Sequence, residues 1–314
     1  MSAAANAVLR RIAAAAGVLL AAATVVFFLE QLMPGNPAVA ILGGAGAHPS
    51  NAQIAAVDHQ YGFDRPLLAQ YLSYLGHLLR GDLGTSYGLH QRVTQVIGDQ
   101  LGPTLVLTST ALVLAWVVSV ASTLLSAGRG RTRQAIGSGV EVVLAGLPQY
   151  WLGLVLLVVF AIQLQWVPVV GGTSVQGLVL PALTLALPLA GFLGQVTRDE
   201  FGSALEQPFA VSARARGMGE REVRWRHALR HAALPGITLS GWAIGALLSG
   251  SVIVEVIYSR PGVGQLLVGA VNNQDLPVVV GVTLLVALVY VVANLLVDIL
   301  YRVADPRLRA PARS

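Results

Sequence analysis

The amino-acid sequence predicts an all-α integral membrane protein with six membrane-spanning helices and a small external cap between the first two. Two observations support this prediction. The chain of 314 residues is 55% hydrophobic and only 11% charged, whereas charged residues make up about a quarter of an ordinary soluble domain. Apolar runs of about 20 residues, long enough to cross a bilayer as a helix, recur along the chain.

The predicted spans are the apolar runs that lie between polar or arginine-rich segments. They cover residues 12–33, 104–127, 136–162, 178–197, 234–258 and 277–301. Pro148 predicts a tilt or bend in the third run, because proline removes a helical hydrogen bond. Arg10 and Arg11 before the first run also suit a secretory signal peptide. However, the run is longer than a usual signal core, and LMPGNP follows it where small residues would mark a cleavage site.

The distribution of arginine predicts the orientation. All twenty basic residues are Arg, and sixteen of them fall on one side of the predicted spans. The other side carries only Arg65, Arg80, Arg92 and Arg260. Because cytoplasmic loops carry the excess of positive charge, we expect both termini, the 198–233 loop and the 302–314 tail in the cytoplasm.

The composition also excludes some chemistry. The sequence contains no Cys, which excludes disulfides and cysteine-ligated metals or clusters. It contains no Lys either, and a standard P-loop requires a lysine to reach the nucleotide phosphates. If the protein uses ATP, we therefore expect another subunit to supply the site.

The chain is expected to divide into three parts. Residues 1–33 form the cytoplasmic N-terminus and first span, residues 34–103 an external cap, and residues 104–314 the core with the other five spans. In the cap, RPLLAQYLSYLGHLL has apolar residues at helical spacing, which predicts a helix after Pro66. This segment is too short for an independent domain with a large core. A structural loop and a docking site are both compatible with it.

The 198–233 loop predicts a helical hairpin. Pro208 suits the first turn of a helix and Gly217 its end, which indicates a short helix over 208–216, a turn at Gly217–Gly219 and a second helix from Glu220. Glu220 and Arg224, like Glu222 and Arg226, have the spacing of helical ion pairs with the acid first.

The second helix of the hairpin has an amphipathic pattern. An apolar stripe of Trp225, Ala228, Leu229 and Ala232 leaves Arg221, Arg224, His227, Arg230 and His231 largely off it, and Ala213, Ala215, Gly217 and Gly219 form a small, flat tip. The hairpin could rest on anionic lipid. A docking element for a cytoplasmic partner explains the small tip better, because small residues allow close backbone approach.

Ionisable residues near the spans are candidate functional groups. Glu141, Glu255 and Asp298 lie near span ends, and we expect structural roles for them, including pairing with loop arginines. His227 and His231 have the spacing of paired zinc ligands, but no HExxH pattern accompanies them and we predict no metal site. His48, His59, His77 and His90 are scattered over the external segment, where surface positions are the simplest interpretation.

A few polar groups are candidates for a transport pathway. Gln149, Tyr150 and Trp151 follow Pro148 in the third span, where a kinked helix could line a channel or simply pack against a neighbour. Ser249 and Ser251 in the fifth span suit a pore lining or close helix packing.

Several motifs resemble one family along nearly the whole chain. They are LMPGNP at 32–37, YGFDRPLLAQYL at 61–72, LLRGDLGTSY at 78–87, ARARGMGEREVRWRHALRHAALP at 213–235, SGSVIVEVIYSRPGVGQLL at 249–267 and NLLVDILYRVADPRLR at 294–309. In this order they resemble the membrane subunits of bacterial binding-protein-dependent ABC importers, most closely the dipeptide, oligopeptide and nickel branch.

The resemblance implies a type I ABC importer permease fold and a role as a permease subunit that is not itself an enzyme. It implies a multi-pass protein of the bacterial inner (plasma) membrane. The implied partners are a second homologous permease subunit, two cytoplasmic ATPases that use ATP and Mg²⁺, an extracytoplasmic solute-binding protein and membrane lipid, with no nucleic acid and no cofactor on this chain. The ATPase-coupling loop would comprise Ser212, Ala213, Arg214, Ala215, Arg216, Gly217, Met218, Gly219 and Glu220.

The chain departs from the family pattern at two places. The wider family opens the coupling loop with Glu-Ala-Ala, where this chain has Val211, Ser212 and Ala213, as the peptide branch often does. Arg260 stands where the branch usually carries an aromatic or apolar residue, and nothing in the sequence explains it.

Peptides are the expected cargo, and nickel or another small solute is the alternative. A secondary transporter acting alone is disfavoured, because the sequence shows no acids at midspan and no visible inverted repeat. A membrane-embedded enzyme is disfavoured because no catalytic set of residues converges within the predicted spans.

Overall fold

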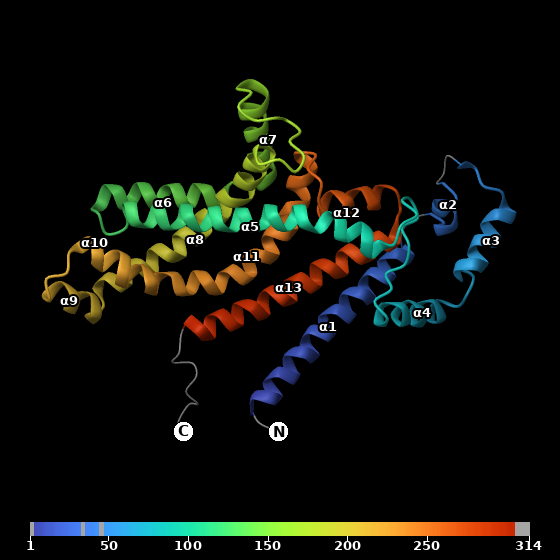
Figure 1. Cartoon of the computed structure of the whole chain (residues 1–314), viewed down its shortest axis with the longest axis horizontal. Coiled ribbons are helices and arrows are strands. Elements are labelled where there is room, and N and C mark those ends of the chain that lie inside the picture. The colour runs from blue at the N-terminus through green and yellow to red at the C-terminus, as the bar shows by residue number, and fades with distance from the viewer. Residues whose placement is uncertain (1–2, 33–34, 44–46, 305–314) are drawn as a thin grey trace. The chain divides into compact units, whose positions relative to one another are not determined.

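The computed structural model describes residues 3–32, 35–43 and 47–304 (Figure 1). Within these ranges the regular structure is helical, apart from one isolated bridge between Thr85 and Arg92. The chain forms two compact units. The first comprises Met1–Gly102 and Pro261–Val291, and the second comprises Pro103–Arg260 and Val292–Ser314.

The first unit contains α1 (Ala3–Leu32), α2 (Pro37–Ile41), α3 (Asn51–Tyr61), α4 (Leu67–Leu79) and α12 (Val263–Asn272), with the first parts of α5 (Val93–Ser126) and α13 (Leu276–Ala304). A capping box of Ser50 and Gln53 begins α3, and Gly62 in the left-handed conformation ends it. The helix predicted from leucine spacing in the cap is α4.

Aliphatic side chains of α5, α12 and α13 form the core of the first unit, including Val93, Ile97, Val263, Val278 and Val282. A loop before α5 is fastened to this core by the buried carboxylate of Asp275. This carboxylate accepts hydrogen bonds from the Ser86 hydroxyl and from the Tyr87 and Gly88 N–H groups, the latter two at 3.1 and 3.2 Å. These hydrogen bonds pair the buried carboxylate with polar groups of the loop, so neither is buried without a partner.

The second unit contains the rest of α5, α6 (Arg131–Gly146), α7 (Gln149–Leu156) continued by a π-helical segment η2 (Leu157–Gln163), α8 (Gln176–Glu206), α9 (Pro208–Ala215), α10 (Glu220–Glu222), the π-helical segment η3 (Val223–Ala228) and α11 (Leu229–Ile257). Its core consists of small and aliphatic side chains from α5, α8 and α11. Close packing also depends on glycine: a Cβ at Gly236 of α11 would lie 2.4 Å from the Trp116 ring of α5.

The membrane-spanning character predicted from the sequence is confirmed. Among the described residues, four helices are long and apolar enough to cross a membrane: Val93–Ser126, Gln176–Glu206, Glu220–Ile257 and Leu276–Ala293. The pair α6 and α7–η2 makes a fifth if its two parts are one span, and α1 adds the apolar stretch Ala13–Leu29.

The helices that contain the third and fifth predicted spans are bent or longer than the predicted runs. The bend predicted near Pro148 in the third span is confirmed, because α6 and α7–η2 meet at 99° at the break before Gln149. Pro148 sits in this break, and a proline favours an extended preceding residue. The fifth predicted span lies within a longer helical path, which runs from Glu220 to Ile257 with Pro235 inside it.

Candidate functional site

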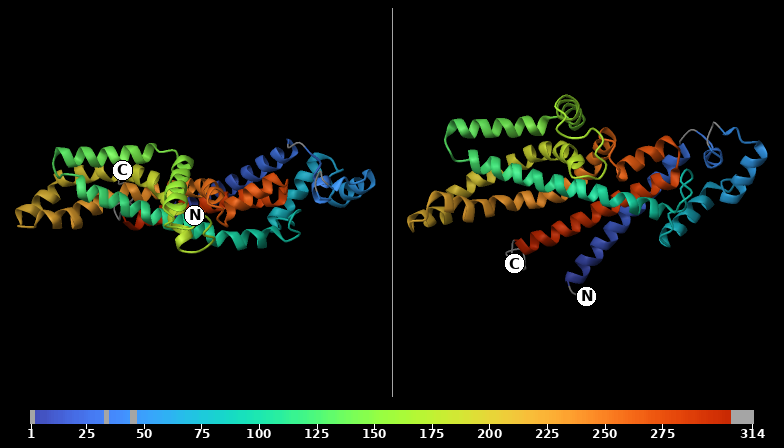
Figure 2. Two further views of the ribbon diagram at one scale, coloured as in Figure 1. Left: turned by 90° about the horizontal axis from the view of Figure 1, so that it is seen from above. Right: turned by 45° about the horizontal axis from the view of Figure 1, so that its top comes forward.

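The predicted hairpin between the fourth and fifth spans is present as α9, a tight turn and α10. Gln207 is extended, and Pro208 then begins α9 in the position where its missing N–H has no cost. Both views in Figure 2 place α9 and α10 at the end of α8 and α11. The hairpin has its own small core of Ala210, Ala213 and Val223, which are fully buried.

The turn is a helix C-cap that requires glycine. Gly217 has φ +83°, and the Met218 N–H donates to the Ala213 carbonyl at 3.1 Å. This bond, with the left-handed residue before it, is the Schellman arrangement that satisfies the last carbonyls of a helix. Met218 also packs on the small hairpin core, so the turn is fixed by both hydrogen bonding and packing.

Arg214 clamps the two arms of the hairpin together. Its Nε donates to Glu220 at 2.5 Å, and its Nη1 donates to the Leu205 carbonyl at 2.9 Å. One side chain therefore joins α8, α9 and α10. The predicted pair of Glu220 with Arg224 is wrong, because Glu220 faces Arg214 across the turn.

Arg224 anchors the hairpin to α5. Its Nη2 donates to the carbonyls of Leu124 and Ala127 at 3.0 and 2.6 Å, and its guanidinium lies 4.9 Å from the centre of the Phe201 ring. Arg224 is 6% exposed, whereas Trp225 is 54% exposed. The predicted stripe is therefore wrong at both residues: Arg224 faces inward and Trp225 outward.

The other predicted features of the second arm are partly confirmed. Glu222 and Arg226 form the expected pair at 2.7 Å, and Ala228 and Ala232 are buried as the stripe requires. His227 and His231 face Phe209, with ring centres at 6.4 and 4.5 Å. Within the described ranges, no group of three or more metal-ligating side chains could hold an ion.

The tip differs from the prediction at one position. Ala213 is completely buried and belongs to the core of the hairpin. The exposed surface is formed by Ser212, Ala215, Arg216, Gly217, Gly219 and Glu220, with Arg214 and Met218 half-buried. This surface is small and polar, and a second chain could approach its backbone closely.

A buried ion pair lies next to the hairpin, between α6 and α8. Arg198 donates from Nε and Nη2 to Glu141 at 2.7 and 2.6 Å, and Glu141 also accepts from the Ser122 hydroxyl at 2.7 Å. Arg198 Nη2 donates further to the Ser126 hydroxyl at 2.8 Å. The two charged side chains are almost fully buried. The expectation that Glu141 pairs with an arginine is confirmed, but this arginine lies within α8 and not in a loop.

Glycines provide the space for this ion pair. A Cβ on Gly137 would lie 2.5 Å from Arg198 Nη2, and a Cβ on Gly194 would lie 2.9 Å from the Glu141 side chain. No charge pattern along one helix indicates such a pair, because its members come from different helices. Glu255 accepts a hydrogen bond from Thr104 at 2.6 Å, and Asp298 lies outside the residues whose side chains are described.

The candidate pathway residues occupy different environments. Tyr150 and Trp151 are about half exposed, and Gln149 lies against α11, where a Cβ on Gly250 would meet its amide at 2.7 Å. Ser249 is exposed, whereas Ser251 is buried and donates to the Leu248 carbonyl at 2.8 Å.

Arg260, which nothing in the sequence explains, is buried and holds two parts of the chain together. Its side chain donates from Nη1 to the Gly172 carbonyl at 2.8 Å, its backbone N–H donates to the Glu255 carbonyl, and the residue is only 2% exposed. The Arg260 side chain thus ties the end of α11 to the loop before α8.

Comparisons with known proteins agree with this architecture. Residues 119–310 match the family described as "Binding-protein-dependent transport system inner membrane component", and residues 5–108 match its N-terminal companion. The glutathione transport system permease protein GsiC of Salmonella choleraesuis (strain SC-B67) is 37% identical over 305 residues, which is 97% of this chain and 99% of that protein. GsiC of Escherichia coli (strain K12) is 34% identical over the same shares.

A solved structure of the MetNI methionine ABC transporter in inward-facing conformations shares the fold. The TM-score is 0.54 at 15% sequence identity, over 67% of this chain and 97% of that chain. The family match covers most of the sequence, and the GsiC likeness extends over nearly all of it. The chain therefore belongs to the family of inner-membrane permease components of binding-protein-dependent ABC import systems, whose ATPases are separate subunits.

Proposed function

We propose that this ABC importer permease subunit forms half of a translocation pathway for peptides. The observation that carries the proposal is the likeness to GsiC, which extends over 97% of the chain. GsiC is described as a glutathione permease, and glutathione is a tripeptide. A di- or oligopeptide is accordingly the proposed cargo, and nickel or another small solute is the alternative.

We further propose that Ser212–Glu220 is the surface that receives the ATPases. Arg214 and Arg224 tie the hairpin to α8 and α5, so a push on the hairpin would move these helix ends with it. The surface offers small and polar groups. A helix that rests in lipid would instead expose a broad apolar face.

The proposed complex contains a second permease subunit, two cytoplasmic ATPases that hydrolyse ATP with Mg²⁺, and an extracytoplasmic binding protein. The 16-to-4 distribution of arginine supports a cytoplasmic location for the hairpin and both termini. The absence of lysine supports an ATP site on other chains.

Substitution of Gly217 tests the coupling role. Gly217→Trp places a large side chain on the exposed turn, where a Cβ meets nothing within 4 Å in this chain. Gly217→Asn is the matched control, because Asn tolerates the left-handed conformation. In proteoliposomes with all subunits, we expect Gly217→Trp to abolish ATP-driven uptake and Gly217→Asn to retain most of it. Normal uptake by the Trp variant would refute the role.

Uptake of labelled solutes tests the cargo. Proteoliposomes containing the complex and its binding protein should accumulate a labelled di- or tripeptide in an ATP-dependent manner. An excess of unlabelled peptide should compete, whereas a nickel chelate should not. Accumulation of the chelate without accumulation of any peptide would refute the peptide proposal and leave the permease role intact.

A further inference from the structure

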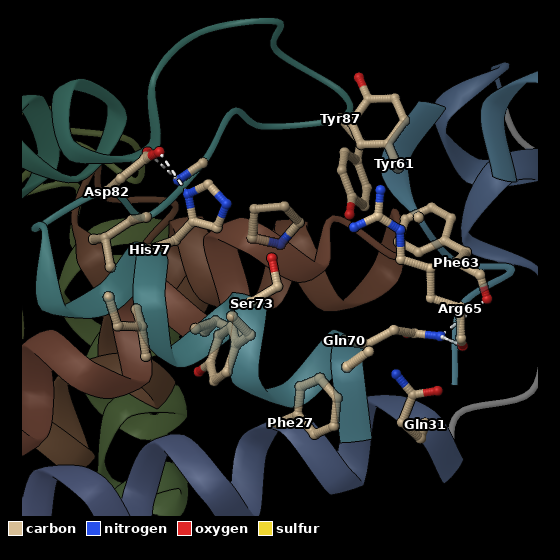
Figure 3. A pocket seen from close by; sticks show the side chains of 18 residues that line it. Phe27, Gln31, Tyr61, Phe63, Arg65, Gln70, Ser73, His77, Asp82 and Tyr87 are labelled. Carbon is tan, nitrogen blue, oxygen red and sulfur yellow. Dashed lines mark hydrogen bonds and ion pairs between the residues drawn. The ribbon is translucent and has the colours of Figure 1, made fainter. Parts of the chain in front are cut away.

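The external cap segment contains a pocket of about 290 Å³ within the first unit. Its wall comes from α1, the end of α3, α4, the loop before α5 and the start of α13 (Figure 3). This volume is just below the usual range for small-molecule sites, about 300–1,000 Å³. The pocket is distinct from the hairpin and from the candidate pathway residues.

One side of the pocket carries a cation among aromatic rings. Figure 3 shows the Arg65 guanidinium beside Tyr61, with Tyr87 and Phe63 close by. Tyr61 stacks on Phe63 with ring centres 5.8 Å apart and meets Tyr87 edge-on at 6.3 Å. These rings form an apolar wall next to a positive charge.

The backbone that carries Arg65 is held in place, while its side chain remains available. The Gln70 amide donates to the carbonyls of Phe63 and Arg65 at 3.0 and 2.8 Å. Arg65 itself is exposed, and among the described residues no hydrogen bond or ion pair engages its guanidinium. Arginine binds carboxylates through paired N–H donors, so this group can receive an anionic ligand.

The opposite side of the pocket carries an anion. Asp82 accepts a hydrogen bond from the Gly84 N–H at 2.9 Å and faces His77 Nδ1 at 3.2 Å. The Gly84 hydrogen bond, assisted by His77, holds the pKa of Asp82 below its usual value. Figure 3 shows Ser73 between this pair and the Arg65 side of the pocket.

We propose that this pocket binds a short peptide in its zwitterionic form. The peptide carboxylate would lie against Arg65, its ammonium group against Asp82, and an apolar side chain against the Tyr61 and Tyr87 rings. The two charges of the pocket stand at opposite ends, as the two charges of a short peptide do. The proposal rests on the proposed peptide cargo and adds an external site at which the permease itself contacts the peptide.

Equilibrium binding of a radiolabelled tripeptide, Ala-Phe-Ala, tests the site. The assembled transporter in lipid nanodiscs, without binding protein, would be compared with its Arg65→Gln and Asp82→Asn variants. Arg80→Gln and Asp64→Asn are the matched controls, because both residues are exposed in the same segment and neither lines the pocket. Each lost charged contact is expected to weaken binding at least about tenfold, which corresponds to about 1.4 kcal/mol.

Tripeptides that lack one charge identify which pocket residue contacts which end of the peptide. The tripeptide with a C-terminal amide has no carboxylate for Arg65, so it should bind Arg65→Gln and the wild type equally. The N-acetylated tripeptide has no ammonium group for Asp82, so it should bind Asp82→Asn and the wild type equally. Absence of tripeptide binding by the wild type, or equal effects of pocket and control variants, would overturn the proposal. It would also be overturned if the pocket variants weakened capture of the binding protein without changing peptide affinity, because the pocket would then be a docking site for that protein.

Uptake by the complete wild-type system separates failure of this proposal from failure of the proposed function. If ATP-driven tripeptide uptake occurs but no pocket binding is found, the pocket proposal is wrong and the peptide function stands. If the wild type transports no peptide, the proposed function fails, and the pocket proposal that rests on it fails as well.

Discussion

Removal of one member of the buried ion pair should have a large and specific effect on stability. In the wild type, the Glu141 carboxylate accepts hydrogen bonds from Nε and Nη2 of Arg198 at 2.7 and 2.6 Å, and Glu141→Gln removes this carboxylate. Arg198 is only 6% exposed, so solvent cannot replace the lost partner. Breaking a buried pair in this way costs about 3–5 kcal/mol. The glutamine can still accept one hydrogen bond, which favours the lower end of that range.

The double variant Glu141→Gln/Arg198→Met determines whether the unpaired charge of Arg198 causes the loss of stability. Removing both charges leaves no unpaired ion, and replacement of a buried pair by uncharged side chains is often nearly neutral. We therefore expect the double variant to be at least about 2 kcal/mol more stable than Glu141→Gln alone. Unfolding of the purified permease in mixed micelles with increasing SDS, followed by tryptophan fluorescence, gives the comparison. A loss below about 0.5 kcal/mol in Glu141→Gln, or a double variant no more stable than Glu141→Gln alone, would refute the reasoning.

Three further predictions concern local packing and anchoring. Gly137→Ala should destabilise the same unfolding transition by about 1–3 kcal/mol, because its Cβ would lie 2.5 Å from Arg198. Gly139→Ala, on the same helix but with no atom within 4 Å of its added Cβ, should be neutral or stabilising by up to about 1 kcal/mol. Equal changes in stability for Gly137→Ala and Gly139→Ala would contradict this prediction. Arg224→Met should release the hairpin from α5 and raise its hydrogen exchange, with unchanged exchange as the contrary result. Asp275→Ala should expose the 84–92 loop to proteolysis, at a cost of about 1–3 kcal/mol; an unaltered cleavage rate would count against it.

Local signals in the sequence predicted the hairpin well. Pro208 and Gly217 act through their own backbone preferences, which are the same in any context. The start of α9, the glycine turn and the pair of Glu222 with Arg226 could therefore be predicted from neighbouring residues alone. The same holds for the membrane-spanning class, which follows from the length and composition of the apolar runs.

Contacts between distant residues could not be predicted in the same way. Arg224 faces inward because the carbonyls at the end of α5, about 100 positions earlier in the chain, need donors. A pattern within one helix contains no information about those carbonyls. The pattern of charges within one helix could not identify Arg198 as the partner of Glu141 either. The position of Glu141 near a span end was a reason to expect some partner. The bend at Pro148 was predictable, but its angle depends on the helices against which α7 packs.

Crosslinking from an introduced cysteine tests most directly whether the hairpin contacts the ATPases. The chain contains no Cys, so Arg216→Cys introduces a single reactive thiol on the exposed turn, and Ser174→Cys introduces one in the exposed loop before α8. In membranes that contain the partner ATPases, a short photocrosslinker attached to the thiol at residue 216 should insert into a neighbouring ATPase on illumination, with a yield that changes on addition of ATP. Residue 174 should give no such product. An ATPase adduct from residue 174 and none from residue 216 would contradict both the orientation and the role of the hairpin.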